Sequence, residues 1–211
     1  MKNRKISLIR SRSIGIPGNY IIPARKKVII PTPFGPAVII WSIDTGRPEI
    51  VRVFISNSRL RIPELAFNSF RRVQVSSSPE IDCAAAAIKS YFDGNDAVFS
   101  MDSLDLRQCS EFQRKVLRAV YAVPRGSVST YGLIAKYLKK PGGARAVGSA
   151  LAANPFPIIF PCHRVVRMDG ALGGYQGGSD MKRALLQKEG VVVSRTGRVS
   201  CGSFYYGKGQ I

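Results

Sequence analysis

Apolar residues in the first half of the chain fall into short runs bounded by turn-forming residues. The runs at 37–44 (AVIIWSID) and 49–56 (EIVRVFIS) are separated by TGRP. This arrangement predicts two strands joined in a β-hairpin. A helical pattern follows at 81–92 (IDCAAAAIKSYF), which the serine and proline at 78–79 can open and Gly94 can close. The first half therefore predicts a small sheet with a helix packed on it.

A second helical pattern lies within 109–126 (CSEFQRKVLRAVYAVPRG). Ser110 followed by Gln113 forms a capping box, and Pro124 can end the helix. The apolar residues at helical spacing are Phe112, Val116, Val120 and Val123. The preceding segment 96–106 (DAVFSMDSLDL) has the length and looseness of a linker, so we predict two domains.

Two short helical patterns follow at 128–138 (VSTYGLIAKYL) and 144–154 (ARAVGSALAAN), joined by KKPGG. Glycine in such a turn is typical of a helix-turn-helix. The second pattern carries small side chains and a single charged residue, Arg145. Small residues can simply allow close packing against the core. They can also let a slim helix enter the DNA minor groove, which is roughly 6 Å wide, with Arg145 placed to intrude.

The segment that follows the helix pair combines prolines, a thiol and glycines. Residues 154–166 (NPFPIIFPCHRVV) are apolar and contain three prolines, which predicts an extended course. Glycines crowd 168–178 (MDGALGGYQGG), as in a tight loop where the backbone must approach something closely. A last helix is expected at 180–190 (DMKRALLQKEG).

The charge balance indicates a polyanionic partner. The chain of 211 residues contains 32 Lys and Arg against 13 Asp and Glu, a formal net charge of +19. Residues 106–190 contribute 14 basic and 4 acidic residues. Such an excess usually means nucleic acid, although a basic proteome or growth environment is an alternative. Residues 1–43 hold eight basic residues and no acidic one, which fits a transit peptide, a DNA-binding arm or a solvated terminus.

Other features exclude several protein classes. No apolar run approaches the roughly 20 residues of a membrane span, and the start lacks the apolar core of a secretory signal, so we expect a soluble protein with no membrane partner. Four cysteines without a CxxC pair, together with a single histidine, make a zinc site improbable and favour a reducing compartment. We expect Cys83, Cys109 and Cys201 to be buried small hydrophobes.

Cys162 and His163, the one histidine of the chain, are adjacent. An unperturbed thiol has a pKa near 8.5 and is about 3% ionised at pH 7, so a nearby base would activate it. Neighbours in an extended strand point to opposite faces. Either the backbone bends sharply at Pro161 or a water bridges the two side chains. A histidine base also needs an orienting acid. The carboxylates that follow are Asp169, Asp180 and Glu189, of which we choose Glu189.

These motifs resemble the O6-alkylguanine-DNA alkyltransferases. PCHRV (161–165) matches the active-site signature of that family. TYGLIA, ARAVGSAL, NPFPII, GALGGYQGG and LLQKEG match its flanking motifs in the same order, over about 110–190. Phe160, in place of an aliphatic residue, and Ser179, in place of leucine, depart from the pattern.

The resemblance implies a two-domain α+β protein. It comprises a basic arm (1–30), a small RNase-H-like α/β domain (31–105), a mostly helical, winged helix-turn-helix-like DNA-binding and active-site domain (106–190), and a tail (191–211). The implied activity is DNA repair by stoichiometric transfer of an alkyl group from O6-alkylguanine, with O4-alkylthymine as a further candidate. The partner would be alkylated duplex DNA bound through its minor groove. We expect a monomer without cofactor or metal, acting in the cytoplasm, at the nucleoid of a prokaryote or in the nucleus of a eukaryote.

The resemblance also implies residue roles. Cys162 would accept the alkyl group, His163 would take its proton through a water, and Glu189 would orient His163. Asn154 would brace the active-site turn, and Tyr131 would press the rotating phosphate and donate to the departing purine. Arg145 would fill the gap left by the flipped base. Further DNA contacts are expected from Ser129, Thr130, Ala144, Ala146, Gly148 and Arg164. Pocket walls are expected from Pro157, Gly174, Tyr175, Gln176 and Gly177.

Four other functions are weaker. A non-reactive module that only recognises alkylated DNA would lack the cysteine. A cysteine hydrolase would need its Cys and His on separate segments. A methyl-sensing transcriptional regulator would need a further DNA-binding domain, and an RNase-H-like nuclease would need clustered carboxylates. The hairpin offers only Asp44 and Glu49.

Overall fold

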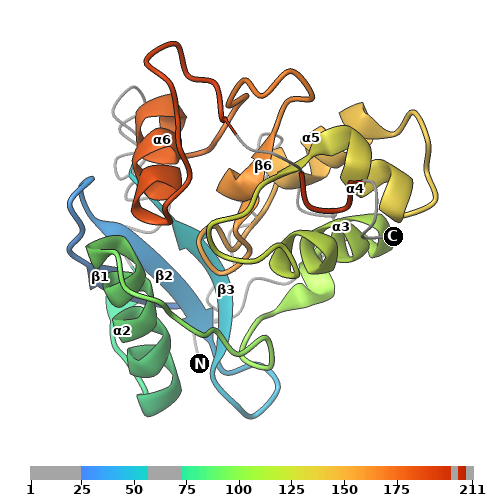
Figure 1. Cartoon of the computed structure of the whole chain (residues 1–211). Helices are drawn as coiled ribbons and strands as arrows, with labels where there is room; N and C mark the ends of the chain where they lie inside the picture. Colours follow the sequence, from blue (N-terminus) through green and yellow to red (C-terminus); the bar gives the residue numbers. More distant parts are fainter. Residues whose placement is uncertain (1–24, 57–72, 201–203, 208–211) are drawn as a thin grey trace, which may run out of the picture.

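A sheet with one helix on it forms the amino-terminal part of the protein (Figure 1). The computed structural model describes residues 25–56, 73–200 and 204–207. The strands described are β1 (Lys26–Ile30), β2 (Ala37–Ser42), β3 (Glu49–Phe54) and β4 (Gln74–Val75). Their order is β3-β2-β1-β4, with β4 parallel to β1 and the other neighbours antiparallel. The pairing of β2 with β3 confirms the predicted hairpin.

Every residue of β2 is buried because both faces of the strand are covered. Side chains alternate between the two faces of a strand. Ile39 and Trp41 belong to the main core. Val38 and Ile40 form a smaller cluster with Val51 on the other side. The strand is therefore a central structural element and carries no chemistry of its own.

The predicted helix at 81–92 is confirmed as α2 (Pro79–Asp93). It buries Ile81, Ile88 and Phe92 in the main core. It ends at Gly94, whose φ of 103° places it in the left-handed region that favours glycine. Tyr91, in its last turn, is also buried. The helix therefore packs through one face and directs its last turn toward the rest of the molecule.

The loose linker predicted at 96–106 is wrong for its second half. The backbone N–H of Ile50 in β3 donates to the carbonyl of Ser103 at 2.6 Å, and that of Asp105 donates to the carbonyl of Ile50 at 2.9 Å. Phe99 and Leu104 are buried in the main core. Because its apolar residues are spaced irregularly, the segment resembles a linker in sequence, although it packs as an edge of the sheet.

The second half is mostly helical. Its elements are the 3₁₀ turn η1 (Leu106–Gln108), α3 (Glu111–Tyr121), β5 (Ser129–Thr130), α4 (Tyr131–Tyr137), α5 (Ala144–Ala152), the 3₁₀ turn η2 (Cys162–Arg164), β6 (Val165–Val166) and α6 (Gly178–Lys188). Helix α3 begins as predicted, because the Ser110 hydroxyl accepts from the Gln113 N–H at 3.2 Å. The Gln113 side chain, however, donates to the carbonyls of Ala150 and Ala153, so it ties α3 to α5.

The two helices predicted at 128–138 and 144–154 are confirmed as α4 and α5, with one correction at the start of the first. Ser129 and Thr130 are extended and pair in parallel with Val165 and Val166. The Thr130 hydroxyl then caps α4 by accepting from the Leu133 N–H at 3.2 Å. This pairing holds the first residue of α4 beside the segment that follows Cys162.

The described part of the tail packs on the helical half. Val191, Val193 and Val199 form an apolar cluster with Val128. Tyr206 is buried, and its hydroxyl donates to the carbonyl of Ala119 in α3 at 3.0 Å. Most of the predicted basic arm (1–24) and Cys201 lie outside the described residues. Within the part of the chain that is described, no helix is long and apolar enough to cross a membrane.

Candidate active site

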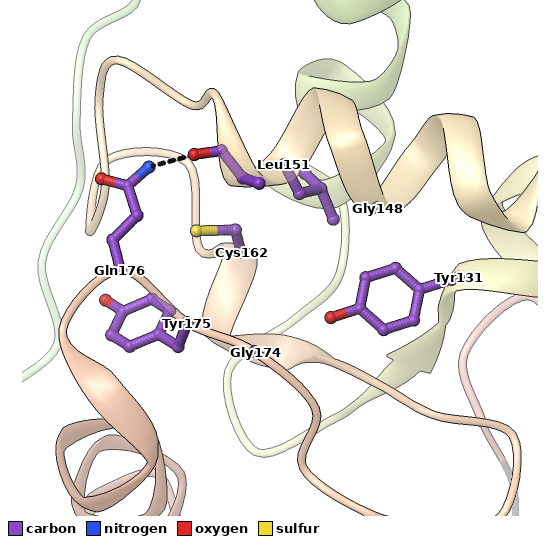
Figure 2. A pocket seen from close by; sticks show the side chains of 8 residues that line it. Tyr131, Gly148, Leu151, Cys162, Gly174, Tyr175 and Gln176 are labelled. Atoms are coloured by element: carbon purple, nitrogen blue, oxygen red, sulfur yellow. Dashed lines mark hydrogen bonds between the residues drawn. The ribbon is translucent and has the colours of Figure 1, made fainter. Parts of the chain in front are cut away.

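A pocket of about 420 Å³ opens beside Cys162 (Figure 2). Its lining residues are Tyr131, Gly148, Leu151, Ala152, Cys162, Gly174, Tyr175 and Gln176. Figure 2 shows the Cys162 sulfur turned into the pocket, with Tyr175 near it and Tyr131 approaching from the opposite side. The size is typical of a small-molecule or base-sized site. Six of the lining residues were predicted from sequence, and Leu151 and Ala152 were not.

The backbone bends at Pro161, which is one of the two arrangements left open by the sequence. Pro161 has φ −77° and ψ 61°, and Cys162 to Arg164 form a 3₁₀ turn where an extended course was predicted. Successive side chains therefore diverge around a turn. The thiol of Cys162 faces the pocket, whereas the imidazole of His163 is fully buried behind it.

Asn154 braces this turn. Its side-chain amide donates to the carbonyl of Phe160 at 3.2 Å and to the Cys162 sulfur at 3.4 Å. Its side-chain oxygen accepts from the Phe156 N–H at 2.9 Å. Burial raises the pKa of the Cys162 thiol, while the Asn154 hydrogen bond and the charge of Lys182 oppose that rise. The net direction is upward, so the resting thiol is neutral and needs a base to become a nucleophile.

His163 is held through one nitrogen only. Its Nε2 lies 2.7 Å from the hydroxyl of Tyr91 and 3.0 Å from a carboxylate oxygen of Glu189. Its Nδ1 is buried and has no hydrogen-bond partner among the described residues. Burial lowers the pKa of His163, and Glu189 opposes this only in part. The imidazole is therefore neutral, with Nδ1 the nitrogen able to accept a proton.

Glu189 ends α6 as predicted and is buried beside His163. Burial raises the pKa of Glu189, but hydrogen bonds from His163 and Arg164 and the charge of Arg164 outweigh burial and hold that pKa well below its ordinary value. Arg164 donates to Glu189 through Nε at 3.0 Å and Nη2 at 2.9 Å. The carboxylate is thus ionised and can stabilise a protonated His163.

Arg164 is turned inward and mostly buried, so the structure gives no support to its predicted DNA contact. Besides Glu189, its guanidinium donates to the carbonyl of Val123 at 2.6 Å, and its side chain is 11% exposed. Ser129 and Thr130 are likewise unsupported as DNA contacts. Both are buried, and the Ser129 hydroxyl donates to the carbonyl of Tyr205 at 2.7 Å. Each of these side chains forms a hydrogen bond with a neighbouring group inside the protein.

Apart from Tyr131 at the start of α4, the remaining predicted DNA contacts lie on α5. Arg145 and Ala146 are exposed at the start of α5, and Ala144 is half-buried. Gly148, one turn further on, faces the ring of Tyr131: a β-carbon there would lie 3.8 Å from it. Burial and the neighbouring Cys162 raise the pKa of Tyr131, which keeps its phenol protonated.

The glycine loop shapes the pocket from the other side. Gly177 is buried, and a β-carbon there would collide with Met181 and Tyr175, so this glycine supports the wall without lining it. Pro157, also predicted as a pocket wall, is buried and is not among the lining residues. Gln176 donates to the carbonyls of Ala152 at 3.2 Å and Asn154 at 2.7 Å, which joins the loop to the end of α5.

Two functional side chains were missed. Lys182 of α6 is buried, and its ammonium donates to the carbonyls of Val165 at 2.6 Å and Gly174 at 3.3 Å. Burial lowers its pKa to about 8, and it contributes positive charge near Cys162. Tyr91 comes from α2, outside the region of the motifs. Its position on an amphipathic helix indicates only a core residue.

Comparison with known proteins gives the family of this chain. Residues 111–191 match the model described as 6-O-methylguanine DNA methyltransferase, DNA binding domain. A methylated-DNA–protein-cysteine methyltransferase of Mycobacterium bovis is 39% identical over 132 residues, which cover 63% of this chain and 79% of that protein. The chain belongs to the O6-methylguanine-DNA methyltransferase family. The resemblance inferred from PCHRV and its flanking motifs is thus confirmed.

Other members of the methyltransferase family show the extent of the match. The enzyme of the same name from Methanothermobacter thermautotrophicus is 46% identical over 105 residues, 50% of this chain, and the chain spans only 58% of its length. A crystal structure of Mycobacterium tuberculosis OGT in complex with DNA superposes with a TM-score of 0.60 at 32% identity, covering 78% of this chain and 92% of that one. The mixed α/β fold is therefore that of methyltransferase structures.

The two departures from the methyltransferase pattern lie outside the pocket lining. Phe160 is fully buried and packs against Tyr121 and Phe156. Ser179 is exposed in the first turn of α6. Of the other cysteines, Cys109 is buried as predicted, whereas Cys83 is exposed on α2, contrary to prediction. Among the described residues, no group of three or more His, Cys, Asp or Glu side chains could hold a metal ion.

Proposed function

We propose that this protein repairs DNA by moving the alkyl group of O6-alkylguanine in duplex DNA onto its own Cys162. The observation that carries the proposal is the joint position of Cys162 and His163. The thiol faces a base-sized pocket, while the adjacent imidazole is neutral, buried and bound to an ionised Glu189. Membership of the methyltransferase family supports the same chemistry.

The proton of the thiol leaves first. Because burial raises the pKa of Cys162, the sulfur becomes a strong nucleophile only when a base takes its proton. Nδ1 of His163 is the candidate base, reached through a bridging water, since Nε2 is engaged by Glu189 and Tyr91. The Glu189 carboxylate then stabilises the imidazolium, and its own partner Arg164 keeps it ionised.

Alkyl transfer is a displacement at carbon. A carbon–sulfur bond forms as the bond between the alkyl carbon and O6 breaks, and the bonding electrons remain on the purine. Tyr131, whose raised pKa keeps it protonated, donates to the departing guanine. The product is a thioether on Cys162. Because no second nucleophile lines the pocket, we propose that one protein molecule repairs one lesion and is then spent.

We further propose how the protein meets DNA. A winged helix-turn-helix within 106–190 would present α5 to the minor groove, and the exposed Arg145 would occupy the gap left by the flipped nucleotide. Flipping is required because an O6-alkyl group inside a stacked duplex is beyond reach of a thiol. Residues 31–105 would form the RNase-H-like domain. The protein would act as a monomer, wherever its DNA is: in the cytoplasm of a prokaryote or in a nucleus.

Mass spectrometry tests the proposal directly. The protein is mixed with excess duplex containing one O6-methylguanine, and the intact mass and peptide map are measured. We expect a single methyl increment on Cys162 and a reaction that stops at one equivalent. An unmodified protein that still shifts the damaged duplex in a gel would contradict the proposal and indicate a recognition module. A second duplex, with O4-methylthymine, extends the test to that base.

A further inference from the structure

The amino-terminal half supplies a side chain to the buried network behind Cys162. Tyr91, in the last turn of α2, places its hydroxyl 2.7 Å from Nε2 of His163, and the same hydroxyl donates to Glu189. These residues are 72 and 98 positions away in the chain. The ring is buried and also packs against the imidazole, with ring centroids 5.9 Å apart.

The hydrogen-bond roles in this network follow from the protonation states. Burial and the neighbouring Glu189 hold the pKa of Tyr91 far above its ordinary value, so the phenol keeps its proton. Glu189 is ionised and can only accept, so the phenol donates to it. The lone pairs of the Tyr91 oxygen and Glu189 then both face Nε2 of His163, which must carry the ring proton. Nδ1 is left deprotonated.

Contacts around Tyr91 hold α2 in this position. Lys188 of α6 donates to the carbonyl of Phe92 at 2.5 Å. Arg125 donates to the carbonyls of Gly94 at 2.5 Å and Asn95 at 2.8 Å, and its guanidinium lies 5.8 Å from the centre of the Tyr91 ring. Two cations of the second half thus bind the carbonyls at the end of α2, where cations are favoured. The helix end that carries Tyr91 is clamped to the element that carries Glu189.

We infer that Tyr91 is a positioning residue for alkyl transfer: its hydroxyl fixes the tautomer and orientation of His163, so that Nδ1 serves as the base for Cys162. This inference rests on the proposed function. It makes the active site a product of both halves of the molecule. The amino-terminal half then takes part in the chemical step through Tyr91.

Tyr91→Phe tests the inference, because phenylalanine keeps the ring and removes the hydroxyl. The first-order rate constant for methylation of Cys162 is measured at saturating duplex from pH 5 to 9. We expect it to fall about tenfold at pH 7, the factor for one lost hydrogen bond to a charged group. Reaction with free O6-methylguanine falls by the same factor, because the defect lies in the chemical step and not in DNA binding.

The pH profile separates positioning from a general structural effect. The titratable and charged groups that face His163 are Tyr91, Cys162, Arg164, Tyr175, Lys182 and Glu189. Without the Tyr91 hydroxyl, Glu189 no longer accepts a hydrogen bond from Tyr91. Its carboxylate then attracts the imidazole proton more strongly, which raises the pKa of His163. The acidic limb of the profile therefore moves to higher pH. A slower rate with an unmoved limb, or a limb moved to lower pH, overturns the inference.

Tyr121→Phe is the matched control. Its hydroxyl donates to the carbonyl of Phe99 at 2.9 Å and also ties the segment after α2 to α3, but it does not touch His163. We expect its rate and pH profile to match those of the wild type. An equal tenfold loss in Tyr121→Phe overturns the inference, because any tyrosine hydroxyl between the halves would then have the same effect.

A double variant tests whether Tyr91 acts through Glu189. In a Glu189→Gln background, the further change Tyr91→Phe lowers the rate less than twofold if the two groups form one unit. A full tenfold loss there overturns the inference. Wild-type protein distinguishes the two proposals: if Cys162 is never alkylated, both fail, whereas normal alkylation with an unaffected Tyr91→Phe removes only this inference.

Discussion

The two halves of the molecule contribute to the candidate active site in different ways. In residues 111–191, which match the family model, the proposed acceptor and the proposed base are consecutive: Cys162 and His163 lie in one turn. Among the described residues 25–56 and 73–105, the contribution to the site that we find is the Tyr91 side chain on α2, whose hydroxyl contacts His163 and Glu189. The comparison teaches that the groups which react can be local in sequence while the groups which hold them are distant. The following predictions test which residues take part in the reaction and which only hold them in place.

Cys162→Ser has the largest expected effect. A serine hydroxyl has a far higher pKa than a thiol, so His163 cannot activate it and alkyl transfer is abolished. Binding to duplex DNA persists, because the exposed residues of α5 are unchanged. Intact mass and a gel shift on the same sample check both parts. Transfer that survives in this variant would mean that another cysteine, such as the exposed Cys83, is the acceptor.

Glu189→Gln comes next, because Glu189 lies where the halves meet. Loss of the charge that stabilises the imidazolium lowers the transfer rate about a hundredfold, the lower range for general base catalysis. Stability changes too. The pKa of Glu189 is lower in the folded protein than its unfolded value of about 4.3, so the carboxylate stabilises the fold above that pH and the effect is lost as pH falls.

Urea unfolding at several pH values checks the stability component. The free energy of unfolding of Glu189→Gln lies below that of the wild type by roughly 2–3 kcal/mol at pH 7, because Arg164 is left with a neutral partner. We expect the gap to begin to close as the pH falls below about 5 and to go on closing until the lowered pKa of Glu189 in the folded protein is passed. A gap that is constant with pH would show that Glu189 is already protonated in the folded protein.

Arg145→Ala separates DNA handling from chemistry within the second half. Arg145 is exposed on α5 and is not among the residues lining the pocket, so its loss spares the reaction with free O6-methylguanine. Repair of duplex falls about tenfold or more, since flipping a base costs a few kcal/mol that the variant no longer offsets. The transfer rates on duplex DNA and on free O6-methylguanine are measured, and equal losses on both would refute the proposed role of Arg145.

Arg125→Ala has the smallest expected effect, because it removes hydrogen bonds that Arg125 makes to the end of α2. Two backbone carbonyls of the amino-terminal half lose their donor, which lowers the free energy of unfolding by about 1–2 kcal/mol. Arg118→Ala, in α3, is a control for loss of an arginine, since we expect no measurable change there. Hydrogen exchange should show the last turn of α2 opening more often in Arg125→Ala only. Equal protection in both variants would argue against a clamp.

Local patterns predicted more of the structure than of the site. The hairpin, α2, α3 and the helix pair follow from turn residues, caps and apolar spacing that act over a few positions. Glu189 could be chosen because few carboxylates follow Cys162. Tyr91 could not, because an apolar helix face looks the same whether its tyrosine fills the core or contacts a distant histidine.

Buried polar residues were the commonest error. Arg164, Ser129 and Thr130 were expected to contact DNA because the family resemblance implied it. Each is instead committed to an internal partner, and Lys182 is buried in a helix whose sequence resembles a solvated surface. Whether such a residue faces inward depends on tertiary contacts that one segment does not encode.

The bond from Tyr206 to Ala119 has a consequence for the order of folding. It joins residues 87 positions apart, whereas α4 and α5 contact each other and lie close together in the chain. Closing so long a loop is entropically costly and comes late relative to local helix formation. We therefore expect the helices to form first, before the tail packs on them and buries the surface that it covers. In pulse-labelling during refolding, amides of α4 would become protected before that of Tyr205, which donates to the carbonyl of Val128.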